Sequence, residues 1–185
     1  MSKHLKKYEK SDEFRKVGKA LNDYQIRHNI IRKDYEELLI LTKNYQNNEI
    51  KFDALFRATL KSFFSLIESD IYGLNEIDTY EGYDDFDRFE VKFKKTFKNI
   101  CFKWNKTELI SNYLDHHFGN LISLKKKRDK LIHPKKKEDI LKATIKEFEQ
   151  LKTEFENYKK MLHTLMDNFF VSIEINDISE LKNLF

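Results

Sequence analysis

At 185 residues, the chain is long enough to bury a core without disulfides or metals, and its length predicts a single domain. Sixteen Phe and nine Tyr exclude a disordered chain, and a net charge of +4 permits nucleic-acid binding without requiring it. Cys101 is the single cysteine, which excludes a disulfide framework and a thiolate zinc site. Because no apolar run could span a bilayer and the first residues lack a secretory signal, we expect a cytoplasmic protein without a membrane partner.

The first half of the sequence predicts two long helices. Residues 1–10 are basic and polar, and we expect them to form a flexible end. Apolar residues then recur at three- and four-residue steps over about 11–45 and 52–77, with a turn near 44–48. The second of these helices has a wide apolar stripe, which indicates packing against more than one neighbour.

One carboxylate interrupts that stripe. Glu68 shares the face of Phe64 and Ile71, whereas Asp70 is expected nearer the edge of the stripe. A buried carboxylate needs a cationic or hydrogen-bonding partner. The alternative is that Glu68 lies at the rim of the stripe in water, and the sequence leaves both interpretations open.

Residues 75–90 carry seven carboxylates, followed by a run of phenylalanines. Their spacing matches no fixed set of metal ligands, so a solvated loop is favoured over a magnesium site. A short helix should follow, and its aromatic ridge is typical of a core rather than of a base-stacking platform: Phe86, Phe89, Phe93, Phe97 and Ile100. A further helix is predicted over about 108–131, a last long helix over 138–170, and a short strand at 171–175.

The segment between the last two helices is strongly basic. Eight of the thirteen residues from Lys125 to Lys137 are Lys or Arg, and the segment contains the single proline, Pro134. Proline predicts that the helix ends near 131–133, with Arg128 in its last turn and His133 at the break. A turn there could bring the two side chains toward one pocket. Glu138 and Asp139 would then lie in the first turn of the next helix.

Arginine and histidine together suit chemistry on phosphate. Guanidinium donates to phosphate oxygens, and imidazole transfers protons near neutral pH. Neighbouring lysines would attract RNA without reading its sequence: Lys125, Lys126, Lys127, Lys130, Lys135, Lys136 and Lys137. No glycine-rich phosphate loop, metal-ligand signature or serine-nucleophile motif is found, which leaves metal-free acid–base chemistry without a cofactor. Spacing and charge alone, however, favour an ordinary solvated helix end over a functional site.

The stretch Arg128-Asp-Lys-Leu-Ile-His133-Pro resembles the motif of the HEPN superfamily, an arginine followed after four to six residues by a histidine. A polar residue typically follows that arginine, and here it is Asp129. The resemblance covers about residues 50–170. It implies an up-and-down helical core there and a homodimer in which two motifs line one cleft. Together with the helix predicted before it, the chain is expected to be an all-α, single-domain bundle of about five long helices over 11–170, with a C-terminal tail at 171–185.

Many members of this superfamily are metal-independent endoribonucleases of toxin–antitoxin or phage-defence systems, which leave a 2′,3′-cyclic phosphate. The resemblance therefore implies that His133 acts as general acid or base and that Arg128 stabilises charge on phosphorus. It also implies that Asp129 orients one of them, that Glu68 contacts the motif from an earlier helix, and that an antitoxin protein is a candidate partner. The alternative is a non-catalytic helical module that binds nucleic acid, a nucleotide or a protein.

Overall fold

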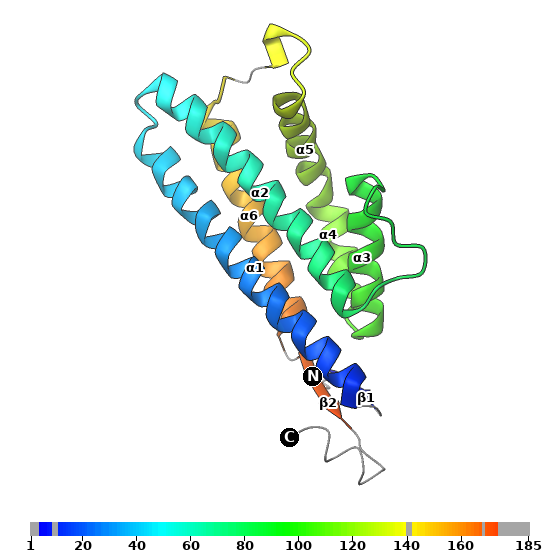
Figure 1. Ribbon diagram of the computed structural model, residues 1–185. Helices are drawn as coiled ribbons and strands as arrows, with labels where there is room; N and C mark the ends of the chain where they lie inside the picture. The colour runs from blue at the N-terminus through cyan, green and yellow to red at the C-terminus, as the bar shows by residue number, and fades with distance from the viewer. Residues whose placement is uncertain (1–3, 9–10, 140–141, 168, 174–185) are drawn as a thin grey trace.

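The computed structural model describes residues 4–8, 11–139, 142–167 and 169–173, and these form an all-α helical bundle with one small sheet (Figure 1). The predicted fold class is thus confirmed. The long elements are α1 (Ser11–Asn44), α2 (Glu49–Ile77), α3 (Phe89–Lys103), α4 (Thr107–His116), α5 (Phe118–Ile132) and α6 (Ile145–Met166). A 3-10 turn, η1 (Lys137–Asp139), lies in the α5–α6 connection.

Helix α2 is the centre of the bundle, where it packs against α1, α3, α5 and α6. This explains its wide apolar stripe, because different faces of the helix meet different neighbours. Aromatic rings from four helices meet around it. Phe63 of α2 packs edge-on against Phe155 and Tyr158 of α6, and Phe93 of α3 lies 5.8 Å from the Tyr113 ring of α4.

Helices α1 and α2 form a close antiparallel hairpin. Asn48 caps α2 by accepting a hydrogen bond from the Lys51 N–H. A Cβ atom at Gly73 would lie 2.5 Å from a Tyr24 ring carbon, so only glycine allows this approach of the two helices. Between the same helices, the buried hydroxyls of Thr42 and Thr59 share a 2.8 Å hydrogen bond.

Three sequence expectations about the helices were wrong. The helix expected over 108–131 is interrupted at His117, which separates α4 from α5. The last helix begins at Ile145 rather than at 138, because Thr144 and Glu147 form a reciprocal capping box there. Phe86 does not belong to the buried ridge: it precedes α3 and is 97% exposed.

The two described end segments pair with each other. Strand β1 (His4–Tyr8) lies parallel to β2 (Phe169–Ile173), with His4 opposite Phe169. The flexible end expected at residues 1–10 thus contains a strand, and the strand expected at 171–175 begins two residues earlier. The remainder of the predicted tail, residues 174–185, lies outside the described residues.

Candidate functional site

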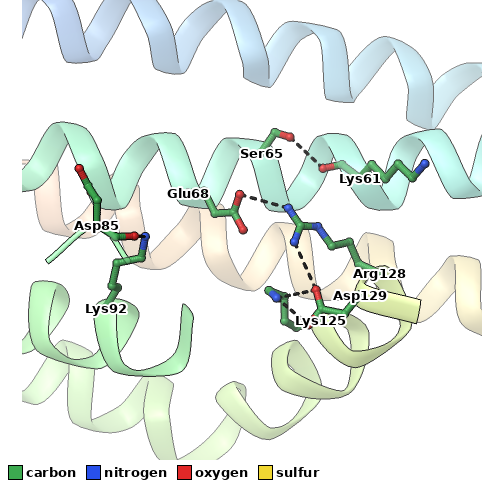
Figure 2. A network of polar contacts seen from close by, with 8 residues as sticks. All are labelled: Lys61, Ser65, Glu68, Asp85, Lys92, Lys125, Arg128 and Asp129. Atoms are coloured by element: carbon green, nitrogen blue, oxygen red, sulfur yellow. Dashed lines mark hydrogen bonds and ion pairs between the residues drawn. The ribbon is translucent and has the colours of Figure 1, made fainter. Parts of the chain in front are cut away.

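Arg128 is held between two helices by carboxylates. It projects from α5 toward α2, where its Nη2 donates to Glu68 Oε2 at 3.2 Å (Figure 2). Its Nη1 donates at the same distance to Asp129 Oδ1. The side chain is 17% exposed, and its Nε is buried without a hydrogen-bond partner among the described residues. The guanidinium is therefore held in place by two carboxylates, and a minor part of the side chain remains exposed to solvent.

Asp129 is itself fixed by a lysine one helical turn earlier. Lys125 Nζ lies 2.6 and 2.7 Å from the two carboxylate oxygens of Asp129 (Figure 2). Partial burial raises the pKa of Asp129, but hydrogen bonds and charge from Lys125 and Arg128 outweigh it, so the pKa is lowered overall. Lys125 Nζ also lies 5.4 Å from the centroid of the Phe89 ring, and this cation–π contact joins α5 to the start of α3.

The position of Glu68 agrees in part with each of the two interpretations that the sequence left open. Its side chain is 38% exposed, at the rim of the α2 stripe, and it nevertheless pairs with Arg128. The structure therefore brings together three of the predicted site residues, Glu68, Arg128 and Asp129. Two of them are separated by sixty positions in the chain.

His133 lies directly after α5 as its C-terminal capping residue, and its N–H donates to the Asp129 carbonyl at 3.0 Å. The predicted helix end is thus confirmed. The imidazole is exposed, and among the described residues no contact joins it to the Arg128 guanidinium. Because α5 continues as far as Ile132, five helical steps turn these two side chains about 140° apart. The expected turn toward one pocket is not formed within a single chain.

A short connection holds the segment after His133. The backbone N–H groups of Lys135 and Lys136 both donate to Asp139 Oδ2 at 2.9 Å, which closes the turn that follows Pro134. Asp139 therefore belongs to this turn and not to the first turn of α6, where the sequence placed it. At the far end, Asp53 of α2 accepts the Ala143 N–H at 2.7 Å. Sequence analysis missed both anchoring carboxylates.

The seven predicted lysines fall into two groups. Lys125 and Lys127 are partly buried in ion pairs with Asp129 and with Glu147 of α6. The other five are exposed, on the last two turns of α5 and beyond Pro134: Lys126, Lys130, Lys135, Lys136 and Lys137. Only this second group is free to meet a polyanion without breaking an ion pair within the bundle.

The buried carboxylate of α2 is Asp70, not Glu68, which corrects the expected position of Asp70 at the edge. Asp70 is 0% exposed, accepts a hydrogen bond from the Tyr158 hydroxyl at 2.8 Å, and lies 2.8 Å from His28 Nδ1. Burial raises the pKa of Asp70, and the contacts to His28 and Tyr158 oppose that change. This network faces α1 and α6, on the side of α2 away from Arg128.

Two wider properties bear on the site. Within the described residues, no group of three or more His, Cys, Asp or Glu side chains is arranged to hold a metal ion. No helix in the described ranges has both the length and the apolar character needed to cross a membrane.

Comparison with known proteins adds no assignment. No protein-family model, curated protein or solved structure matches this chain. The HEPN resemblance therefore stays a prediction that is based on the motif.

Proposed function

We propose that the chain is a metal-independent endoribonuclease of the HEPN type, which cuts RNA through the 2′-hydroxyl of its substrate. The observation that carries the proposal is the arrangement at the end of α5. There, Arg128 is fixed by Glu68 from another helix, His133 is exposed one residue beyond the helix, and free lysines lie on both sides of it.

The chemistry requires one proton acceptor, one proton donor and a cation. The 2′-oxygen forms a bond to phosphorus while its proton goes to a general base, and the bond from phosphorus to the 5′-oxygen breaks as a general acid protonates that oxygen. The products are a 2′,3′-cyclic phosphate and a 5′-hydroxyl. His133 is the acid or the base, and Arg128 stabilises the negative charge that develops on the phosphoryl oxygens. Asp129 and Glu68 orient the guanidinium.

The separation of the two side chains supports a homodimer as the active form. One imidazole cannot accept and donate a proton in the same step, and Arg128 and His133 of one chain turn apart. Two copies whose α5 ends meet at one cleft would supply a second imidazole and a second guanidinium. An antitoxin partner, in a toxin–antitoxin or phage-defence setting, would act by covering this same basic end.

A second candidate function is non-catalytic binding of RNA, a nucleotide or a protein. The observation that favours it is that both Nη atoms of Arg128 are already engaged by carboxylates. Phosphate would have to displace at least one of them. In a binding module, the exposed lysines alone would attract the polyanion and the ion pairs of Arg128 would only stabilise the bundle.

The experiment that separates these functions is cleavage of 5′-labelled RNA in EDTA. Wild type is compared with His133→Ala, with Arg128→Ala and with His116→Ala, a matched control because His116 is also an exposed histidine. Circular dichroism checks that each variant is folded. We expect wild type and His116→Ala to cut RNA to cyclic phosphate ends, and the other two variants to lose at least about a hundredfold in rate. DNA of the same sequence should remain intact.

Salt-sensitive binding by the folded wild type without cleavage of any RNA would favour the binding module. Equal cleavage by wild type and His133→Ala would exclude His133 from the chemistry.

A further inference from the structure

A pocket of about 370 Å³ opens between α1, α2 and α6, away from the proposed ribonuclease site. Its walls are mostly apolar and include Tyr24, Leu66, Phe155, Leu162 and Met166. Leu66 lies two residues before Glu68 on α2, which is about 200° of helix rotation, so the pocket and the Arg128 network use opposite faces of this helix. The volume is sufficient for a small organic molecule.

The polar side chains that line the pocket are basic or neutral, and Gln25 and Asn29 are among the neutral ones. His28, Arg32, Lys159 and His163 line it, and its described lining residues include no carboxylate. Glu36 lies just outside the pocket and offsets part of the positive charge. Arg32 Nη1 lies 2.8 Å from both carboxylate oxygens of Glu36, and Lys159 Nζ lies 3.6 Å from Glu36 Oε1. Arg32 and Lys159 place two permanent cations at the edge of the pocket, whereas the two nearest carboxylates, Glu36 beside them and Asp70 beneath His28, lie outside its lining.

The floor of the pocket is held rigidly. The Tyr158 hydroxyl and His28 Nδ1 both contact the fully buried Asp70 carboxylate, each at 2.8 Å. Asp70 therefore fixes the His28 ring and leaves Nε2 as the ring nitrogen available to a ligand. Pre-formed walls and a fixed polar group reduce the entropy that the protein's own side chains must lose when a ligand binds.

We propose that this pocket binds a small aromatic anion. The flat ring lies against the apolar walls, near the Tyr24 and Phe155 rings, and the anionic group lies at the edge formed by Arg32 and Lys159. A bare phosphate would leave the apolar walls exposed to water, and a neutral hydrocarbon would not use the cationic edge. The proposal does not depend on the ribonuclease function, because none of these residues belongs to the α5 site.

Two dyes with the same aromatic skeleton test the proposal on the full chain. The anionic probe is 1-anilinonaphthalene-8-sulfonate, and N-phenyl-1-naphthylamine is its neutral counterpart. Fluorescence titrations compare wild type with Arg32→Gln/Lys159→Gln, in which the two replaced side chains are 26% and 46% exposed. The control is Lys43→Gln/Lys152→Gln, which removes the same charge from the same two helices outside the pocket.

A third variant, Met166→Trp, fills the pocket, and Ile30→Trp, at an exposed position of α1 outside it, is its control. Benzoate and AMP are tested as competitors that carry a carboxylate and a phosphate respectively, and inorganic phosphate is the competitor without a ring. Thermal unfolding confirms that each variant is folded.

We expect one anionic dye per chain, weakened roughly five- to tenfold by Arg32→Gln/Lys159→Gln and not by its control. The neutral dye should bind both double variants equally. Met166→Trp should abolish binding of both dyes while Ile30→Trp does not, and benzoate or AMP should displace the anionic dye while phosphate does not.

Equal affinity of the anionic dye for the two double variants would contradict the proposal that Arg32 and Lys159 bind the anionic group. Unchanged binding in a folded Met166→Trp would move the dye site out of this pocket, and displacement by phosphate alone would overturn the need for a ring. If Met166→Trp does not fold, the two double variants still decide the proposal.

Discussion

Asp70 and Glu154 are carboxylates that the fold buries almost completely, at 0% and 2% exposure. Ionising either carboxylate costs free energy, because burial removes the water that stabilises the charged form. Asp70 has two close polar partners, His28 and Tyr158. Glu154 is less well supported: Asn120 donates to its Oε1 at 3.0 Å, and its Oε2 has no hydrogen-bond partner among the described residues.

The pH dependence of stability should reflect Glu154. Burial raises its pKa above the ordinary value of 4.5, although Asn120, His117 and Asn157 act in the opposite direction. The protonated form is thus favoured in the folded state, and the stability that it contributes is lost as pH rises through the folded-state pKa. Glu154→Gln keeps an oxygen for Asn120 but cannot ionise. We expect the free energy of unfolding of the variant, relative to wild type, to increase as pH rises above 4.5.

Urea unfolding at several pH values measures this difference. Asp70 also has a raised pKa, but it is present in both proteins, so its contribution cancels. Glu149→Gln, at an exposed position of the same helix, is the control and should follow wild type. A constant difference between Glu154→Gln and wild type across the pH range would contradict a raised pKa for Glu154.

Glu68 offers a test of positioning at the proposed ribonuclease site. In Glu68→Gln the charge that fixes the Arg128 guanidinium from α2 is removed, while the side-chain shape remains. We expect RNA to bind at least as tightly, because a competing negative charge is gone, and maximal cleavage to slow by roughly tenfold because the guanidinium is less well oriented. Single-turnover rates and RNA affinity, measured separately, distinguish the two effects.

The matched control for that variant is Glu76→Gln. Glu76 pairs with Arg27 at 2.5 Å on the α1 side of the same helix, so its substitution changes the net charge equally without touching Arg128. Cleavage slowed to the same extent in both variants would indicate a general effect of charge or stability rather than positioning of Arg128.

At the scale of the elements, the connection from α5 to α6 decides where the basic segment lies. It is closed by Asp139 at one end and by the capping box of α6 at the other. Thr144→Ala removes the oxygen that accepts the Glu147 N–H at 3.2 Å. We expect it to lower the free energy of unfolding by about 1 kcal/mol, measured by urea denaturation.

Thr153→Ala is the control for this prediction. Thr153 is exposed in the middle of α6, where alanine is the better helix former, so this substitution should be neutral or slightly stabilising. Equal losses in the two variants would mean that the cap contributes little.

The boundaries of these elements show how far the sequence alone could lead. Helices α1 and α2 were predicted closely because their apolar period is regular and a turn separates them. The start of α6 was misplaced because Glu138 and Asp139 matched first-turn carboxylates, although the true signal, Thr144 followed by Glu147 three residues later, was present. The break at His117 leaves no mark in the apolar pattern, because Leu114 and Phe118 both pack on the core and keep a helical four-residue spacing across it.

The candidate site was predictable only in part, for physical reasons. Pro134 predicted the helix end at His133, because proline disfavours helical angles at the residue before it. Apolar periodicity alone gave less. It could not give the contact between Glu68 and Arg128, since sixty residues separate them and only packing brings α2 to α5. It misplaced Asp70 because a central helix has no single outer edge, and the position opposite Glu68 meets α1 and α6.

For the whole molecule, the free lysines predict how binding responds to salt. Lys135, Lys136 and Lys137 are exposed beyond Pro134. If they neutralise phosphates, the triple substitution to Gln should reduce the slope of log affinity against log salt by about 2 for single-stranded RNA. The control is Lys16→Gln, Lys33→Gln and Lys98→Gln together, at exposed positions of α1 and α3. RNA titrations at several salt concentrations measure the slope for wild type and for both triple variants. A slope for the Lys135, Lys136 and Lys137 variant equal to that of wild type would exclude these lysines from the interface.

The pairing of β1 with β2 has a consequence for the order in which the chain can fold. His4 must meet Phe169, so nearly the whole chain forms the loop that this contact closes. The entropic cost of closing a loop grows with the length of the loop. The α1–α2 hairpin, whose contacts join residues near in sequence, can therefore form early, and the β1–β2 pair forms later. During synthesis, β1 leaves the ribosome first and has no partner until β2 has been made. Strand β1 is therefore completed only by a segment that is synthesised much later than β1 itself.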